Sequence, residues 1–211
     1  MRYIDVLRSL GTDTPASREA VLEQRGAERA PLCEYFYAYM RAPEMREEID
    51  LVFWARQAQQ ESIPGRTAIV VDLSARCHKP ARHQHGATPA EVAAFMALAL
   101  RCEEKAIFLG ADNLVHVPIS ESLTEIFKIQ EHRETGRRLV AEWLTSILWN
   151  MEVDRIILLT GYPGHLPNLS TDTPLIEFNT ASDQFKRETW NGWTKLRRMG
   201  PRSFEKIREV S

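Results

Sequence analysis

Short apolar runs alternate with helical patterns over the C-terminal two thirds of the chain. The run at 67–73 is apolar and β-branched, as in a strand that is buried on both faces of a sheet. Similar runs predict strands at 105–109, 154–160 and 175–178, and a weaker pattern predicts another at 114–119. Strands that alternate with helices form right-handed βαβ units. We therefore predict an α/β fold with a three-layer, mainly parallel, Rossmann-like sheet.

The helical patterns lie on either side of these strands. A capping box predicts one helix start, with Thr88 as the N-cap, Pro89 at the first helical position and Glu91 completing the box. The longest periodic pattern predicts a helix at 134–151, and a final helix is expected at 182–199.

The N-terminal part of the chain is predicted to be helical throughout. An aromatic-rich helix is expected at 31–42 and a second one after Pro43. The Pro64-Gly65 pair interrupts the pattern. We therefore divide the chain into a helical segment at 1–64, packed on the core, and an α/β domain at 65–211.

Composition and charge narrow the class of protein. The chain has 211 residues, is 44% hydrophobic and has a net charge of -2, so no global field attracts it to nucleic acid or membrane. Three cysteines without a CxxC spacing fit a reducing compartment. Neither a signal peptide nor a membrane-spanning run is evident, so we expect a cytoplasmic protein with no membrane partner.

The loop at 74–87 follows the first predicted strand and is the main candidate for a site. In open parallel sheets, ligands bind beyond the carboxyl ends of the strands. The loop has no acidic residue and leads into the helix start at Thr88, where unpaired N–H groups favour anions. Its basic and imidazole side chains are Arg76, His78, Lys79, Arg82, His83 and His85. We expect Arg76, His78, Arg82 and Thr88 to bind a phosphate or carboxylate; the alternative is a solvated basic loop.

A metal site is a second hypothesis for the same loop. His83 and His85, with Cys77 and Asp72 nearby in sequence, offer ligands that suit zinc or another transition metal. The spacing matches no established zinc pattern, and the neighbouring cations oppose a dication. A divalent metal is therefore a candidate cofactor, with His83 and His85 as its ligands.

Three further residues follow predicted strands. Asp72 ends the first strand and is a candidate general base, metal ligand or ribose-hydroxyl acceptor. Asp112 is a candidate substrate-binding residue, although its sequence context is also ordinary for a turn. His165 follows the 154–160 strand in a glycine-containing loop and is a candidate acid or base. We predict Asp72, His85 and His165 as catalytic residues that meet at one rim of the sheet.

Two groups of fragments resemble known families. Val71-Asp-Leu-Ser74, Gly86 to Glu91 and Ala97-Leu-Ala99 are similar to the nucleoside 2-deoxyribosyltransferase pattern, which implies a nucleoside substrate handled by Asp72 and Glu91. His85-Gly86 and His165-Leu-Pro167 resemble parts of the creatininase-like amidohydrolases, which are metal enzymes. The first family's opening strand is missing here, and the second family's fragments occur in the opposite order. The capping box also explains Glu91 without catalysis.

The function we predict is an enzyme that acts on a small anionic or nucleotide-like substrate by hydrolysis or group transfer. No G-x-S-x-G, G-x-G-x-x-G or P-loop motif occurs. The alternative is a non-catalytic module that binds nucleic acid or protein. Segment 186–209 carries eight basic and three acidic residues together with Trp190 and Trp193, which suits nucleic acid. The aromatic segment 31–54 is a candidate face for a homo-oligomer.

Overall fold

The chain divides into two compact units, Met1–Gln60 and Glu61–Ser211. The computed structural model describes residues 31–80, 87–110, 114–118, 120–132, 144–145, 151–162, 173–181, 187–190, 193–197 and 203–210. The division falls four residues before the boundary that the Pro64-Gly65 pair indicates. The reason is that the first strand already begins at Ile63.

The described part of the first unit, from residue 31 onward, contains the α-helices α3 (Leu32–Arg41) and α4 (Arg46–Ala58), joined by the short 3-10 helix η1 (Pro43–Met45). The rings of Tyr35 and Phe53 meet edge to face with centroids 6.1 Å apart, which fixes one contact between α3 and α4. Tyr35 and Phe53 are both fully buried. Trp54 in the same segment is only half-buried, and the oligomer face predicted for 31–54 stays a prediction.

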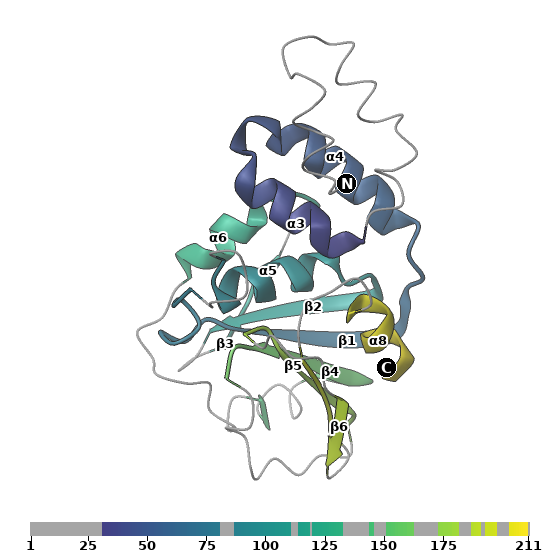
Figure 1. Cartoon of the computed structure of the whole chain (residues 1–211). Coiled ribbons are helices and arrows are strands. Elements are labelled where there is room, and N and C mark those ends of the chain that lie inside the picture. Colours follow the sequence, from purple (N-terminus) through teal and green to yellow (C-terminus); the bar gives the residue numbers. More distant parts are fainter. Residues whose placement is uncertain are drawn as a thin grey trace. The chain divides into compact units, whose positions relative to one another are not determined.

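The second unit is built on one seven-stranded sheet with the order β3-β2-β1-β4-β5-β7-β6 (Figure 1). The strands are β1 (Ile63–Asp72), β2 (Cys102–Gly110), β3 (Leu114–His116), β4 (Arg155–Thr160), β5 (Leu175–Asn179), β6 (Arg187–Trp190) and β7 (Trp193–Arg197). Five neighbouring strands pair in parallel, in the order β2-β1-β4-β5-β7. The two edge strands, β3 and β6, pair antiparallel. The predicted mainly parallel α/β fold is therefore confirmed.

Both faces of the central strands are buried, which explains their continuous apolar sequences. One face carries a cluster that includes Ala68, Val70, Ile156 and Leu158, and the helical residue Leu144 packs on it. The other face is covered by α5 (Pro89–Ala99), which contacts β1, β4 and α6 (Glu125–Glu131). Figure 1 shows α5 lying along the sheet. These helices on two faces of the sheet are the three predicted layers.

The predicted capping box is present at the start of α5. Thr88 Oγ1 accepts a hydrogen bond from Glu91 N at 3.2 Å, and Glu91 Oε2 accepts one from Thr88 N at 2.6 Å. The other end of α5 is held by Lys105 of β2. Its ammonium group donates to the carbonyls of Ala97, Leu98 and Leu100 at 2.9–3.2 Å. The positive charge of a lysine at this end of a helix also interacts favourably with the helix dipole.

The predicted helix at 182–199 is wrong, because this stretch contains the antiparallel pair β6 and β7. Trp190 pairs with Trp193, so only Asn191-Gly192 separates the two strands in sequence. Asn-Gly is the strongest short signal for a hairpin, and it overrides the helical spacing of the two tryptophans. The strand at 175–178 is therefore not the last one. A short helix, α8 (Ser203–Val210), follows the hairpin.

Two other predicted elements differ in extent from the structure. The strand predicted at 114–119 is limited to the three residues of β3. Most of the helix predicted at 134–151 lies outside the described residues; Leu144 and Thr145 within it are helical. In the described part of the chain, no helix is both long and apolar enough to cross a membrane.

Candidate functional site

The site is centred on Asp72, the last residue of β1. The strand β1 lies between β2 and β4 and runs parallel to both, so all three carboxyl ends meet at one edge of the sheet. At this edge Asp72 pairs with Gly110 of β2, and Val71 pairs with Leu159 of β4. The register therefore brings Asp72 next to Thr160, the last residue of β4.

Both carboxylate oxygens of Asp72 accept hydrogen bonds. Oδ1 accepts one from the backbone N–H of Ser74 at 2.9 Å, and Oδ2 accepts one from Thr160 Oγ1 at 2.6 Å. The hydroxyl of Thr160 in turn accepts a hydrogen bond from Tyr162 N at 3.1 Å. We call Asp72, Ser74 and Thr160 the Asp72 cluster. Its members are 3%, 1% and 4% exposed, so the cluster is shielded from bulk water.

The negative charge of Asp72 has no basic partner among the described residues, where no ion pair to it is formed. Buried charges in proteins are normally paired or bound to a metal ion. The hydrogen bonds from Ser74 and Thr160 stabilise the carboxylate but bring no positive charge. Next to the carboxylate, the cluster holds the hydroxyl oxygen of Thr160, whereas the Ser74 hydroxyl lies against the Cys77 thiol.

Cys77 and Gly161 close the inner side of the cluster. The thiol of Cys77 is fully buried and lies 3.6 Å from Ser74 Oγ. Burial, with the Asp72 carboxylate adding to it, raises the pKa of Cys77 to about 12, so this side chain is a neutral packing group at pH 7. A Cβ added at Gly161 would lie 2.7 Å from Pro89 Cβ and 3.4 Å from Cys77 Sγ. Only glycine allows this close approach of the β4 loop to α5.

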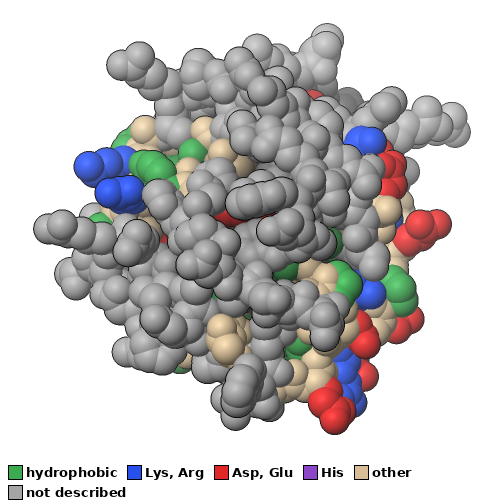
Figure 2. All heavy atoms as spheres, turned by 90° about the horizontal axis from the view of Figure 1, so that it is seen from below, with side chains coloured by type: hydrophobic (Ala, Val, Ile, Leu, Met, Phe, Trp, Pro, Cys, Tyr) green, Lys and Arg blue, Asp and Glu red, His purple; other side chains and the backbone are tan. Residues whose placement is uncertain are grey.

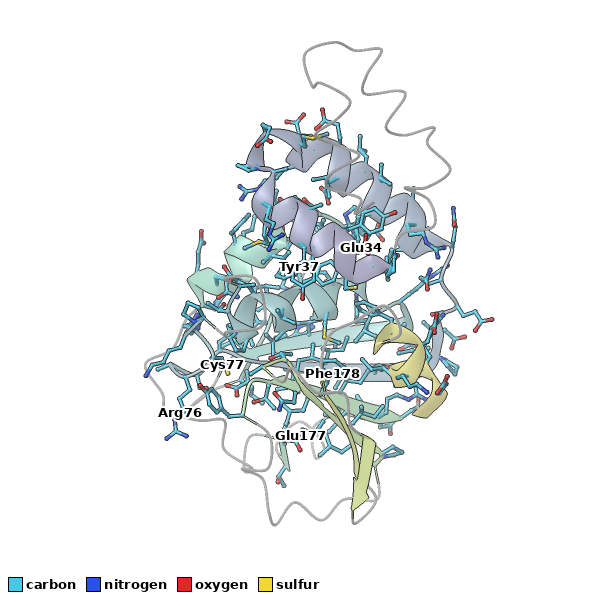
Figure 3. The ribbon with its side chains drawn as sticks, viewed as in Figure 1. Glu34, Tyr37, Arg76, Cys77, Glu177 and Phe178 are labelled. Carbon is cyan, nitrogen blue, oxygen red and sulfur yellow. The ribbon has the colours of Figure 1, made fainter. Side chains whose placement is uncertain are left out.

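The outer side of the cluster is formed by Arg76 and Tyr162. The guanidinium carbon of Arg76 lies 5.8 Å from the centroid of the Tyr162 ring. Figure 3 shows Arg76 extending outward from the loop after β1, whereas Cys77 turns toward the sheet. Arg76 is exposed, and Tyr162 is 36% exposed. Two loops that are far apart in sequence thus meet at the rim.

The start of α5 does not offer the free donors that were predicted for an anion. Ala90 N donates to the Cys77 carbonyl at 3.0 Å, and Val92 N donates to the Thr88 carbonyl at 3.1 Å. Glu91 N donates to the Thr88 hydroxyl, and the Glu91 carboxylate already occupies the position of an anion at this end. These hydrogen bonds argue against Thr88 as a residue that binds substrate.

The remaining predicted site residues fall into two groups. His78 is half-buried, and its Nε2 lies 3.1 Å from the Leu73 carbonyl, so the ring is tied to its own loop. Five of the predicted residues lie outside the described part of the chain: Arg82, His83, His85, Asp112 and His165. Whether Asp72, His85 and His165 meet at one rim stays a prediction. The described residues include no group of three or more His, Cys, Asp and Glu that could hold a metal ion.

Two surface cavities lie away from the Asp72 cluster. One, of about 370 Å³, lies beside α6, and its carboxylate Glu125 accepts hydrogen bonds from Ser120 and Lys128. The other, of about 360 Å³, lies at the amino ends of the strands and contains the ion pair of Arg66 with Glu104. Figure 2 likewise shows acidic and basic side chains side by side along its right-hand border. Because these charges neutralise one another, neither cavity is a better candidate than the Asp72 cluster.

Sequence reasoning identified Asp72 and Arg76 but missed Thr160 and Tyr162 as residues of the site. A signal was present, because Thr160 is the polar end of the strongest apolar run. Its meaning depends on the pairing of β1 with β4, which the sequence does not contain.

Comparisons with known proteins identify a fold and no family. No protein-family model matches the chain, and no curated protein matches it. Among solved structures, the chain is similar to the crystal structure of the Ro (RSR) protein of Deinococcus radiodurans, with a TM-score of 0.58 and 15% sequence identity. The similarity covers 87% of this chain and 47% of that protein, so the chain spans about half its length. At this identity the likeness concerns the fold alone.

Proposed function

We propose that this chain is a binding domain that holds a divalent cation at the Asp72 cluster and binds an anionic group of a small ligand there. The observation that carries the proposal is the buried Asp72 carboxylate, which accepts hydrogen bonds from the Thr160 hydroxyl and the Ser74 backbone N–H and has no basic partner among the described residues. Its position at the carboxyl end of the central strand is where ligands bind in open parallel sheets.

The donor atoms fit a hard cation. Carboxylate and hydroxyl oxygens suit Mg²⁺, Mn²⁺ or Ca²⁺ better than zinc, which favours imidazole and thiolate. Mg²⁺ is commonly bound by one or two carboxylates and completes its coordination with water and with oxygens of the ligand. Asp72, Ser74 and Thr160 would hold such an ion. A site with a single carboxylate leaves positions for the anionic group of a ligand, which agrees with the anionic substrate class predicted from the sequence.

Binding is the better-supported form of this function, and turnover is not part of the proposal. Among the described residues, no imidazole contacts the hydroxyl of Ser74 or of Thr160. A Ser or Thr nucleophile needs an adjacent base. Hydrolysis or group transfer through His85 or His165 stays a prediction from the sequence, as does nucleic-acid binding through 186–209.

The test measures cation binding by the full chain. Mn²⁺ is titrated into the protein and followed by electron paramagnetic resonance of the free ion, and Mg²⁺ is titrated by calorimetry. The variants are Asp72→Asn, which removes the charge with almost no change of shape, and Ser74→Ala, which removes one hydroxyl. Glu152→Gln is the matched control, because the Glu152 side chain is 98% exposed and lies away from the cluster.

We expect one saturable site in the wild-type protein and in Glu152→Gln. Asp72→Asn should lose cation binding, and Ser74→Ala should weaken it by about tenfold, which corresponds to one lost ligand of about 1.4 kcal/mol. Circular dichroism of each variant separates a lost site from a lost fold. The proposal fails if the wild-type protein binds neither ion, or if a folded Asp72→Asn binds them as the wild type does.

A further inference from the structure

The stacked pair of Arg76 and Tyr162 is a second functional element at the same rim. Arg76 comes four residues after Asp72, and Tyr162 comes two residues after Thr160. The backbone N–H of Tyr162 donates to the Thr160 hydroxyl that itself donates to Asp72. The backbone of Tyr162 is thus tied to the Asp72 cluster, and Arg76 reaches the same rim through its contact with the Tyr162 ring.

The geometry of the stack leaves the guanidinium ready to bind an anion. The guanidinium carbon of Arg76, 5.8 Å from the ring centroid, lies within cation–π distance of Tyr162, and this contact does not use the N–H groups of Arg76 as hydrogen-bond donors to a carboxylate. The stack also limits the rotamers of Arg76, so less entropy is lost when these N–H groups bind a ligand. Within the described residues, no carboxylate lies within ion-pair distance of Arg76. The segment from Leu73 to Pro80 contains no acidic residue that would compete with a ligand for the Arg76 guanidinium.

We propose that Arg76, positioned by the ring of Tyr162, binds a phosphate group of the ligand. This inference rests on the function proposed above, because the same ligand would reach the cation at the Asp72 cluster. A guanidinium binds two oxygens of a phosphate with two parallel hydrogen bonds. A phosphate monoester has a third terminal oxygen for a hard cation, whereas the guanidinium already contacts both oxygens of a carboxylate. The ligand class is therefore a small phosphate monoester.

The experiment uses inorganic phosphate as the probe and acetate as the competing anion. Binding to the full chain is measured by ³¹P NMR line broadening and by calorimetry, with and without Mg²⁺. The variants are Arg76→Gln, Arg76→Lys, Tyr162→Leu and Tyr162→Phe. Lys79→Gln is the matched control, because Lys79 is an exposed cation in the same loop.

We expect Arg76→Gln to weaken phosphate binding by about tenfold or more, the loss of two charge-assisted hydrogen bonds. Arg76→Lys should retain only part of the wild-type affinity for phosphate, since an ammonium cannot form two parallel hydrogen bonds to the phosphate oxygens. Tyr162→Leu should weaken binding by a smaller factor, and Tyr162→Phe should bind as the wild type does, because the ring face alone positions Arg76. Urea denaturation of both variants separates this effect from a role of Tyr162 in folding, because Tyr162→Leu should weaken phosphate binding while the protein stays folded. Lys79→Gln should have no effect, and acetate should bind more weakly than phosphate.

The outcomes separate this inference from the proposed function. If cation binding depends on Asp72 but phosphate binds Arg76→Gln and the wild type alike, the inference is wrong and the cation site stands. If no cation binds and phosphate still requires Arg76, the proposed function is wrong and the phosphate contact stands. If phosphate does not bind to the wild-type protein, or acetate binds as tightly, the ligand class is wrong.

Discussion

Replacing Thr160 by Val removes one hydroxyl from a buried network and leaves the shape of the side chain almost unchanged. The hydroxyl of Thr160 donates to Asp72 Oδ2 at 2.6 Å, and the residue is 4% exposed. Without this donor, one oxygen of a buried carboxylate loses its partner from the protein. We expect Thr160→Val to destabilise the fold.

The size of the effect follows from these contacts. A hydrogen bond to a charged group contributes about 1.5–3 kcal/mol to stability. The second bond of this hydroxyl, from Tyr162 N, adds little, because Tyr162 is 36% exposed and water can replace the lost acceptor. We therefore expect a loss of about 2–3 kcal/mol in the free energy of unfolding. In a domain of this size that corresponds to a decrease in Tm of roughly 5–10 °C.

The structure supplies a matched control at the end of the neighbouring strand β5, where the backbone N–H of Thr180 donates to the Thr160 carbonyl at 2.8 Å. Thr180 is fully buried, but its hydroxyl has no hydrogen-bond partner among the described residues. Thr180→Val makes the same chemical change and removes an unpaired polar group, so it should be neutral or stabilise by about 1 kcal/mol. Both variants are measured by urea denaturation, followed by circular dichroism and tryptophan fluorescence.

The reasoning would be refuted in two ways. If Thr160→Val unfolds at the wild-type urea concentration, the bond to Asp72 contributes nothing. If Thr180→Val costs as much as Thr160→Val, any loss of a hydroxyl at this edge is harmful. Only a difference of at least 2 kcal/mol between the two variants, estimated from the value of such bonds, supports the network.

Three further changes test other contacts. Gly161→Ala should destabilise the fold by about 1–3 kcal/mol, because its Cβ would lie 2.7 Å from Pro89 Cβ; an unchanged urea midpoint would contradict the close approach. Burial, with Glu34 adding to it, raises the pKa of Cys33 to about 12, so iodoacetamide at pH 8 should label this thiol only after unfolding, as mass spectrometry can check. Since the unfolded thiol ionises near pH 8.5, the stability that Cys33 contributes is present below that pH and is lost as the pH rises toward 12; a Cys33→Ser variant that keeps the same pH profile would disprove this. Thr88→Ala should cost about 1 kcal/mol by removing the cap of α5, and Thr88→Ser should restore it in the same urea titration.

The sheet could be predicted because burial on both faces leaves a strong mark in the sequence. β1 and β4 are buried along most of their lengths, and such strands are read as uninterrupted apolar runs. The hairpin of β6 and β7 was missed because Trp190 and Trp193 also fit a helical spacing. Here the turn dipeptide Asn191-Gly192 was the better indicator, since it acts on the backbone directly.

The site could be predicted only in part. The strand-end rule identified Asp72 from the sequence, because it needs only the position of one strand. Thr160 lies 88 residues further along the chain, and its contact with Asp72 follows from the strand order. The anion site expected at Thr88 was a plausible use of a helix start, but the carboxylate of Glu91 takes that position. Sequence shows which groups could bind, and only the fold shows which of them are already bound to one another.

The distance along the chain between Asp72 and Thr160 has a consequence during synthesis. Ribosomes add about 5–20 residues per second, so the 88 residues between them take roughly 4–18 seconds to make. Over that interval the nascent chain can pair β1 with β2, but the other edge of β1 stays open until β4 emerges. Until then Asp72 lacks the hydroxyl of Thr160, so the hydrogen bond that holds one of its carboxylate oxygens in the finished protein is made only after β4 has paired with β1.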